Sequence, residues 1–377
     1  MKLGDLRTPA LVLDRAAVAR NKAAMAKRAS QHGVKLRPHV KTAKCIEVAR
    51  LATEGQPGGL TVSTLAEAEF FARHGFRDIT YAVGLSPAKL DDVIALRRDG
   101  VDLKLLTDDL GVARAIAERA RAEAVRLDVF IEIDCGYGRA GLGPEAPELI
   151  PLGRTLNLPP YVVLAGVLTH AGQSYHAKGE AAIQAAAEEE RRALIRAAER
   201  LKEASLPCPT LSAGATPTAT LGTRFDSLGE LRPGNYVFYD LTMHSLGVCR
   251  LEDIAVSVLA SVIGHHKTAG HIVIDAGFMA LSKDLGAHEY LPDAGLGYVM
   301  DERARARLPG LSVTEVSQEH GKIAVRSSQD YERLPIGARV RVLPNHICAT
   351  AATYSHYNVV EGAGETVTAR WARCSGW

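Results

Sequence analysis

Hydrophobic and polar positions alternate in two different ways along this chain. Up to about residue 240, short apolar runs are separated by longer stretches in which apolar residues recur with helical spacing. This strand–helix rhythm predicts βαβ units and a parallel sheet. Eight or so repeats favour a closed (β/α)8 barrel over an open doubly wound sheet, because no G-x-G-x-x-G turn follows the first run. The expected strands lie in residues 10–14, 34–40, 59–64, 78–83, 102–108, 127–134, 162–170, 209–216 and 234–240.

The pattern changes after about residue 245. Short strand-like runs with few helical stretches between them occupy residues 253–266, 270–278, 321–327, 338–346 and 357–362. We therefore expect a barrel over residues 15–245 and a mainly β domain over residues 246–377, to which residues 1–14 add a strand. The expected helix at residues 180–204 carries charge along one side, which indicates a solvated face without a function of its own.

Composition narrows the classes of function. Hydrophobic residues make up 47% of the 377 residues, enough for a large core. The formal net charge is +2, from 45 basic and 43 acidic residues, which gives no electrostatic case for nucleic acid or an anionic membrane as partner. No run of about 18 apolar residues predicts a membrane span, and no signal peptide is evident. Six scattered cysteines without a C-x-x-C pair suit a reducing cytoplasm.

A barrel places its chemistry at the carboxyl ends of its strands, and several suggestive residues lie there. Lys41 follows the second run, within "RPHVKTAK", crowded by Arg37, His39 and Lys44. A lysine whose pKa is lowered by such neighbours can form a Schiff base with a carbonyl. The alternative is a surface lysine in a loop, which position alone does not exclude.

Two glycine-containing loops could approach an anion. "SAGATPTA", residues 212–219, offers backbone N–H groups and the hydroxyls of Thr216 and Thr218, and "ELRPGNYVFYD", residues 230–240, offers a second loop at the next strand. A phosphate between adjacent loops is a common barrel arrangement, and an ordinary turn is the alternative. In "DCGYGRAG", residues 134–141, glycines surround Arg139, which could bind a phenolate or carboxylate or be merely solvated.

A possible metal pair lies in "LPNHICAT", residues 343–350. His346 and Cys348 are two apart, so on an extended strand both side chains would point to one side. An imidazole and a thiolate suit zinc, while a buried cysteine beside a hydrogen-bonded histidine is the alternative. Each signal is weak alone, but an imine-forming lysine with a phosphate loop on a barrel suggests pyridoxal 5'-phosphate (PLP).

The sequence also resembles a known family over nearly its whole length. The motifs "TPALVLD", "RPHVKTAK", "TVSTLAEAEFF", "IEIDCGYGRAG", "VLTHAGQSY", "SAGATPTA", "ELRPGNYVFYDL", "VIDAGFMALSKD", "QEHG" and "PNHICAT" look like those of the D-serine dehydratase and D-threonine aldolase group. These are PLP enzymes with the alanine racemase (fold type III) architecture. The resemblance implies a head-to-tail homodimer that acts on a small D-amino acid.

The resemblance also implies roles for individual residues. Lys41 would be the Schiff-base lysine, with His39 beside it as a further catalytic residue, and His346 and Cys348 would bind a divalent metal, zinc first and manganese, cobalt or magnesium otherwise. Arg232 occupies the place where alanine racemases have an arginine facing the pyridine nitrogen. The other cofactor- and substrate-binding residues would be Arg139, His170, Gln173, Tyr175, Gly214, Ala215, Thr216, Thr218, Gly234, Asn235 and Tyr236.

The metal pair bears on the reaction. A metal can act as Lewis acid on a β-hydroxyl, so that the hydroxyl leaves after the α-proton is lost. Dehydratases of this group carry His-x-Cys and aldolases tend to carry His-x-Asp, and this chain has "PNHICAT". We therefore expect a D-3-hydroxy amino acid dehydratase that acts on D-serine, D-threonine or 3-hydroxy-D-aspartate and releases a 2-oxo acid and ammonia. The alternatives are an aldolase that gives glycine and an aldehyde and, more remotely, a racemase or a non-catalytic PLP-binding protein.

Overall fold

The structure of the protein is a computed structural model, and it describes residues 1–304 and 306–377. The chain forms two compact units. One comprises Met1–Ala24, Cys45–Val48 and Asn235–Cys374, and the other comprises Met25–Lys44, Ala49–Gly234 and Ser375–Trp377. The domain limits expected from the sequence, residues 15–245 and 246–377 with 1–14, stay a prediction.

The unit that begins at Met25 is built on eight parallel strands. Their order in the sheet is β2-β9-β8-β7-β6-β5-β4-β3. Their bounds are β2 (Lys35–Leu36), β3 (Leu60–Val62), β4 (Asp78–Tyr81), β5 (Asp102–Thr107), β6 (Leu127–Ile133), β7 (Val162–Thr169), β8 (Leu211–Ala213) and β9 (Glu230–Leu231). Just past β2, His39 forms a parallel bridge with Thr61 of β3, and Val40 N–H donates to Thr61 O at 2.9 Å. The two ends of the sheet are therefore joined, which confirms the barrel.

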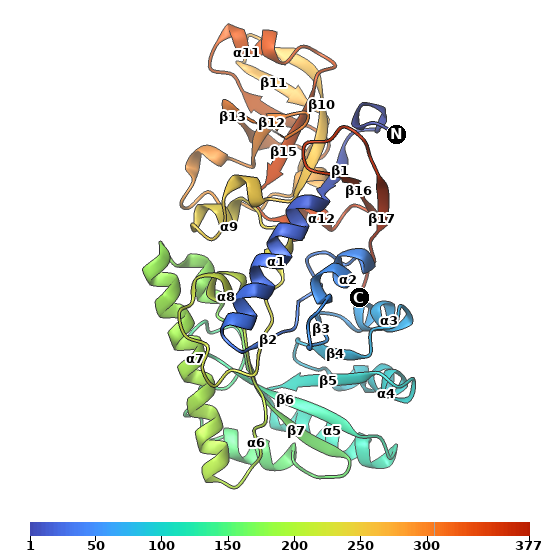
Figure 1. Cartoon of the computed structure of the whole chain (residues 1–377), viewed down its shortest axis with the longest axis vertical. Helices are drawn as coiled ribbons and strands as arrows, with labels where there is room; N and C mark the ends of the chain where they lie inside the picture. The colour runs from blue at the N-terminus through green and yellow to red at the C-terminus, as the bar shows by residue number, and fades with distance from the viewer. Residues whose placement is uncertain (305) are drawn as a thin grey trace. The chain divides into compact units, whose positions relative to one another are not determined.

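Most residues of the barrel strands are buried because helices cover the outside of the barrel. All seven residues of β6 are buried, as parallel sheets require. Figure 1 shows α3, α4 and α5 outside strands β3 to β5. The helices are α1 (Arg15–Gln31), whose first residues belong to the other unit, α2 (Ile46–Thr53), α3 (Leu65–Arg73), α4 (Leu90–Arg98), α5 (Leu110–Ala122), α6 (Leu149–Thr155), α7 (Glu180–Glu203) and α8 (Thr216–Leu221), with 3-10 turns η2 (Pro87–Lys89) and η3 (Gly172–His176).

Side-chain caps fix where two of these helices begin. Thr64 accepts a hydrogen bond from the backbone N–H of Glu67 at the start of α3, and Asp109 accepts one from that of Val112 at the start of α5. Each cap satisfies an N–H group that the helix leaves unpaired. One residue separates each capping residue from the barrel strand before it, so the loops that lead into α3 and α5 are short.

The other unit contains a nine-stranded sheet in the order β11-β14-β13-β12-β15-β10-β1-β16-β17. Neighbouring strands are antiparallel except for β1 and β16, and β11 also pairs with β10, which closes six strands into a β-barrel. The strands are β1 (Ala10–Asp14), β10 (Val256–His266), β11 (His271–Ile274), β12 (Gly297–Asp301), β13 (Arg307–Val316), β14 (Gly321–Ala324), β15 (Arg339–Pro344), β16 (His356–Val360) and β17 (Ala369–Ala372).

Short helices connect these strands. They are α9 (Leu241–Ser245), α10 (Phe278–Leu281), α11 (Ser328–Arg333) and α12 (Ile347–Ala351), with 3-10 turns η1 (Leu3–Asp5), η4 (Asn235–Val237), η5 (Leu251–Asp253) and η6 (Pro292–Ala294). In the part of the chain that the structure describes, no helix combines the length and the apolar character needed to cross a membrane.

The strand expected at residues 234–240 is wrong. The eighth barrel strand is β9, four residues earlier, and residues 235–237 form the turn η4. The backbone N–H groups of Phe238 and Tyr239 both donate to Asn235 O, at 2.9 and 2.7 Å, so this segment satisfies its donors locally. Pro233 has no N–H to offer a neighbouring strand, which ends the ladder just before this point.

Candidate functional site

Lys41 lies in the loop that follows β2, at the carboxyl end of the barrel strands, and its side chain is exposed. Its backbone N–H donates to Nδ1 of His39 over 3.4 Å, and His39 N–H donates to Pro233 O at 3.0 Å. Gly234 packs against this loop so closely that a Cβ there would lie 2.8 Å from His39 O, so only glycine fits. The loops that follow β2 and β9 therefore hold each other in place at Lys41.

Two neutral imidazoles stand beside Lys41. Burial, and then the positive charges of Lys41 and Arg232, lower the pKa of His39 well below its ordinary value. Burial, and then Lys41, Arg139 and Arg232, lower the pKa of His170 to about 3. His170 Nδ1 lies 3.5 Å from Gly214 O, where a neutral ring donates its N–H. Two or three positive charges therefore act on each of these imidazoles, and the five residues, Lys41, His39, His170, Arg139 and Arg232, form one cluster.

Arg139 lies in the loop that follows β6. Its guanidinium is half exposed, 4.0 Å from the carboxylate of Glu132 and 5.8 Å from the ring centre of Tyr137. Asp134 shapes this loop, because its Oδ1 accepts the backbone N–H groups of residues 136, 137 and 138 at 2.9, 2.9 and 3.0 Å. The arginine is therefore presented on an ordered loop with a hydrogen-bonding face left to solvent.

Gln173 and Tyr175 lie in η3, at the end of β7. Gln173 Nε2 donates to Cys135 O at 3.1 Å, which ties this turn to the loop that follows β6. The rings of Tyr175 and His170 lie 6.0 Å apart between their centres. Both residues therefore border the His170 side of the cluster, and their expected roles in the pocket stay predictions.

The loop at residues 212–219 is held by a carboxylate that the sequence did not reveal. Glu190 of α7 is buried and accepts Gly214 N–H at 2.9 Å, Ala171 N–H at 3.2 Å and the Thr218 hydroxyl at 2.8 Å. Burial raises its pKa, against the effect of these hydrogen bonds. The N–H group of Gly214 and the hydroxyl of Thr218 therefore donate to Glu190 within the protein.

Thr216 is the residue of this loop left with an unused donor. Ala215 N–H donates to Thr218 Oγ1 at 3.1 Å. The buried Thr216 hydroxyl has no hydrogen-bond partner among the described residues. An unpaired buried hydroxyl costs free energy unless a ligand satisfies it, so Thr216 fits a phosphate oxygen.

The segment of the other unit that begins at Asn235 has similar unpaired groups. Asn235 Nδ2 donates to Asp240 Oδ2 at 2.6 Å, while Asn235 Oδ1 and the hydroxyl of Tyr236 are buried without a partner among the described residues. Burial raises the pKa of Tyr236, so the hydroxyl keeps its proton and can donate it. Tyr236 therefore suits an anionic oxygen, and its expected role in binding the cofactor stays a prediction.

Arg232 is a buried cation fixed to the barrel wall. Its Nη2 donates to Thr169 O at 2.6 Å, and its Nη1 donates to Ala213 O at 3.1 Å and to the Ser212 hydroxyl. Burial lowers the pKa of Arg232 to about 10, although neighbouring carboxylates, Glu230 first, oppose the shift. The side chain stays charged at neutral pH.

His346 and Cys348 do not lie on a strand, as the spacing argument assumed. Strand β15 ends at Pro344, His346 caps α12, and Cys348 is the second residue of that helix. The two side chains still interact, and with Asp284 they form a polar cluster. Burial lowers the pKa of His346, but hydrogen bonds with Asp284 and Cys348 outweigh it and raise that pKa to about 11.

Asp284 is the partner that sequence inspection missed. Its Oδ2 lies 2.6 Å from His346 Nδ1, which leaves Nε2 for a metal. Among the described residues, no group of three or more His, Cys, Asp or Glu side chains is arranged to hold a metal by itself. A soft thiolate and an imidazole oriented by a carboxylate fit zinc in an open site, where water or substrate completes the shell.

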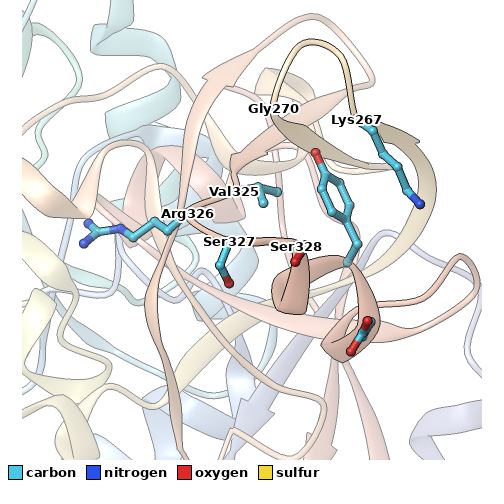
Figure 2. Close-up of a pocket in the computed structure, with 8 residues that line it drawn as sticks. Lys267, Gly270, Val325, Arg326, Ser327 and Ser328 are labelled. Atoms are coloured by element: carbon cyan, nitrogen blue, oxygen red, sulfur yellow. The ribbon is translucent and has the colours of Figure 1, made fainter.

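A surface hollow of about 450 Å³ lies elsewhere on the same unit, lined by Lys267, Gly270, Val325, Arg326, Ser327, Ser328, Tyr331 and Glu332. None of the expected site residues lines it. Arg326 and Lys267 extend in opposite directions there (Figure 2), so its two cations do not converge on one ligand. The hollow is therefore no rival to the cluster around Lys41.

Comparison with protein families gives two matches in succession. The family described as "Alanine racemase, N-terminal domain" matches residues 13–241, and "Putative serine dehydratase domain" matches residues 255–360. Among curated proteins, D-threo-3-hydroxyaspartate dehydratase of Delftia sp. is 45% identical over 99% of this chain and 98% of its own length. D-serine dehydratase of Dictyostelium discoideum is 31% identical over 97% of this chain and 96% of its own length.

A further relative carries out a different reaction by name. The 3-hydroxy-D-aspartate aldolase of Paracoccus denitrificans is 28% identical over 100% of this chain and 95% of its own length. Among solved structures, the Delftia dehydratase superposes with a TM-score of 0.96 at 44% identity, covering both chains fully. A cysteine-to-alanine variant of a D-threo-3-hydroxyaspartate dehydratase, described as in the metal-free form, superposes with the same TM-score of 0.96 at 44% identity.

Proposed function

The chain belongs to the D-serine dehydratase family of lyases with the alanine racemase fold, and we propose that it dehydrates a D-3-hydroxy amino acid to a 2-oxo acid and ammonia. This family depends on PLP. The observation that carries the proposal is the full-length likeness to D-threo-3-hydroxyaspartate dehydratase, at 45% identity against 28% for the aldolase. We propose D-threo-3-hydroxyaspartate as the preferred substrate, with D-serine and D-threonine as further substrates.

The residues that would hold PLP are those with unused polar groups and nearby charge. Lys41 would carry the cofactor covalently, Thr216 and Tyr236 would bind its phosphate, and Arg139 its phenolic oxygen. Arg232 would face its ring, and His170 would pack beside that ring. When bound, PLP supplies an electron sink that stabilises negative charge at the substrate α-carbon.

The chain's own groups would then move the protons. The amine of Lys41 would take the α-proton from one face, which would give the preference for the D-enantiomer. His39 orients the Lys41 loop through the backbone hydrogen bond, and as a neutral imidazole it adds no further positive charge beside the amine. Gln173, which is tied to Cys135 O, would border the substrate.

The β-hydroxyl is the group that leaves, and we propose that His346 and Cys348 hold a divalent metal, zinc first, for this step. A metal there supplies a Lewis acid for the hydroxyl oxygen. Asp284 fixes the ring of His346 through Nδ1. A cysteine-to-alanine variant of a D-threo-3-hydroxyaspartate dehydratase is described in a metal-free form, which supports a cysteine, here Cys348, as one of the ligands.

Cleavage of the Cα–Cβ bond is the second candidate reaction, because an aldolase shares this fold over nearly its whole length. It would need a base that removes the hydroxyl proton rather than an acid that helps the hydroxyl leave. We also propose that the enzyme is a homodimer and works in the cytoplasm, because none of its six cysteines forms a disulfide bond.

Substrate ranking tests the proposal. Enzyme reconstituted with PLP and Zn²⁺ is given D-threo-3-hydroxyaspartate, D-serine and D-threonine, before and after treatment with a chelator. We expect kcat/KM to be highest with D-threo-3-hydroxyaspartate and activity on all three to fall on chelation. Full activity without metal would overturn the role given to His346 and Cys348.

A further inference from the structure

A line of buried polar side chains runs through the barrel from Arg37 to Arg232. Arg37 Nε donates to Glu230 Oε2 at 2.7 Å, and the Ser212 hydroxyl donates to Glu230 Oε1 at 2.6 Å. Ser212 Oγ then accepts a hydrogen bond from Arg232 Nη1. All four residues are at most 5% exposed, so water does not compete for these bonds.

Glu230 sets the direction of the bond between Ser212 and Arg232. A carboxylate only accepts hydrogen bonds, so the Ser212 hydroxyl must point its hydrogen at Glu230. The lone pairs of Ser212 Oγ are then turned to the guanidinium of Arg232, which only donates. Replacement of one Glu230 oxygen by an amide N–H₂ would remove this constraint.

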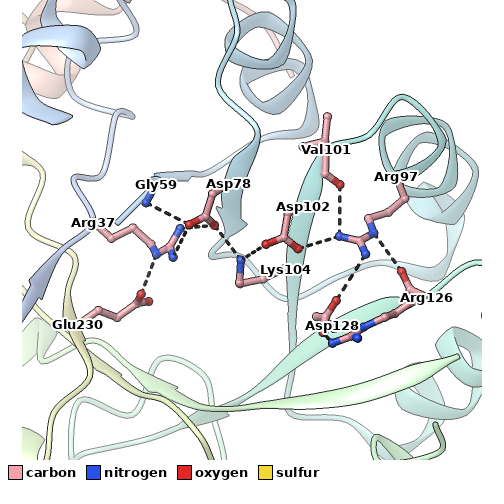
Figure 3. A network of polar contacts seen from close by, with 10 residues as sticks. All are labelled: Arg37, Gly59, Asp78, Arg97, Val101, Asp102, Lys104, Arg126, Asp128 and Glu230. Carbon is pink, nitrogen blue, oxygen red and sulfur yellow. Dashed lines mark hydrogen bonds and ion pairs between the residues drawn. The ribbon is translucent and has the colours of Figure 1, made fainter. Parts of the chain in front are cut away.

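Glu230 is itself held from the other side. The two terminal nitrogens of Arg37 donate to the two oxygens of Asp78, at 2.7 and 3.0 Å, and Lys104 donates to Asp78 at 2.7 Å. Figure 3 shows the continuation of this network from Lys104 to Asp102 and Arg97. A bidentate arginine pair has one geometry, so Arg37 presents its Nε–H to Glu230 in a fixed direction.

The far end of the line lies in the site. The charge of Arg232 acts on His39 and His170, the same two imidazoles that the charge of Lys41 acts on. With both terminal nitrogens of Arg232 bound to the barrel wall, its Nε–H is left without a hydrogen bond to any described residue. That N–H is available to a ligand.

We propose that Glu230, acting through Ser212, is a positioning residue that fixes the guanidinium of Arg232 in one orientation toward the cofactor ring. This inference rests on the proposed function, since it assumes that PLP binds beside Lys41. The buried ion pair between Arg37 and Glu230 would then influence the electronic state of the cofactor, whereas a purely structural ion pair would not.

The test reads the cofactor before any catalysis. Glu230→Gln and Ser212→Ala are compared with wild type for the absorbance maximum of bound PLP and for the Kd of the apoenzyme for PLP. Asp102→Asn is the matched control, because it removes ion pairs at the solvent end of the same network. We expect both test variants to shift the absorbance maximum and to weaken PLP binding about tenfold, and the control to change neither.

A double-mutant cycle separates positioning from folding. In an Arg232→Leu background, Glu230→Gln should produce no further change in the absorbance maximum, because the residue through which it acts is gone. If Glu230→Gln lowers the melting temperature but leaves the absorbance maximum and Kd at wild-type values, the inference is wrong. If that variant does not fold, Ser212→Ala, a small change, decides by the same two readouts. Absence of any PLP absorbance in the wild type would instead overturn the proposed function.

Discussion

Oδ2 of Asp284 lies 2.6 Å from Nδ1 of His346, so the imidazole next to Cys348 is oriented by a carboxylate. We predict that Asp284→Asn weakens zinc binding about 10- to 100-fold, since loss of a partner that orients a metal ligand has effects of this size. Zinc content after dialysis against graded chelator measures this. The PLP absorbance should not change, because Asp284 has no assigned role at the cofactor.

Two further variants serve as controls for the measurement of zinc affinity. Cys348→Ala removes a proposed ligand and should lose more zinc than Asp284→Asn. Asp293→Asn breaks a surface pair with Arg307 on the same unit and should keep full zinc affinity. Equal zinc affinity in Asp284→Asn and wild type would contradict the role given to the carboxylate.

Lys41 should be indispensable for both the cofactor linkage and turnover. We predict that Lys41→Ala abolishes the imine absorbance and lowers the rate of oxo acid release below detection, since no other amine is assigned to that position. Lys44→Ala is the neighbouring control: Lys44 forms an ion pair with Glu67 at 3.0 Å, and its loss should leave the imine band in place. Imine absorbance that survives in Lys41→Ala would show that another lysine holds the cofactor.

Substitution of Thr216 tests the role of the loop at residues 212–219, because it should change protein stability and PLP affinity independently. Thr216→Val removes a buried hydroxyl without a partner among the described residues and keeps the shape of the side chain. We predict that the apoenzyme melts at the same temperature or higher, while PLP binding weakens about tenfold. Isothermal titration and thermal melts measure the two effects. The control is Thr220→Val, which removes a hydroxyl that donates to Thr216 O at 2.7 Å, and this variant should lose stability and keep PLP affinity. A Thr216→Val variant that loses stability but keeps PLP affinity would argue against a role of Thr216 in phosphate binding.

Asp78 makes the stability of the barrel depend on pH in the acidic range. Although burial raises the pKa of Asp78, hydrogen bonds and charge from Arg37 and Lys104 outweigh it and lower that pKa from 3.8 to about 2. A lowered folded-state pKa stabilises the fold above the unfolded value, and this stability is lost as pH falls from about 4 to 2. The contribution should be about 1 kcal/mol, because the carboxylate is 39% exposed and water screens it.

The measurement for Asp78 is urea unfolding of wild type and Asp78→Asn across this pH range. The difference in unfolding free energy should be constant above about pH 5 and shrink toward pH 2. A difference that grows on acidification would mean that the sign of the shift is wrong.

The barrel could be predicted from the chain because most residues of its strands are buried, so that the strands β2 to β8 fall within short, mainly apolar runs. The position of the eighth strand was predicted wrongly, because β9 has only two residues and the apolar run after Pro233 forms a turn. Lys41, Arg139 and His170 were singled out because each lies at or shortly after the end of such a run, and their roles stay predictions. The position of His346 and Cys348 was misjudged, because α12 starts within three residues of the end of β15.

The carboxylates that organise the site could not be found in this way. Glu190 lies in the charge-rich stretch of α7 that indicated a solvated face, yet the turn of the helix directs this one glutamate inward to Gly214 and Thr218. Glu230 and Asp284 meet their partners across 18 to 193 residues of sequence, which no local pattern encodes. Spacing locates residues on elements, whereas tertiary packing chooses which of them meet.

The most direct test of the account is product analysis with D-threo-3-hydroxyaspartate as the substrate of the PLP- and Zn²⁺-loaded enzyme. Oxaloacetate, ammonia, glycine and glyoxylate are measured in one time course. The account predicts oxaloacetate and ammonia in equal amounts, without glycine. Glycine and glyoxylate in equal amounts would show that the enzyme breaks the Cα–Cβ bond, and would contradict dehydration as its reaction.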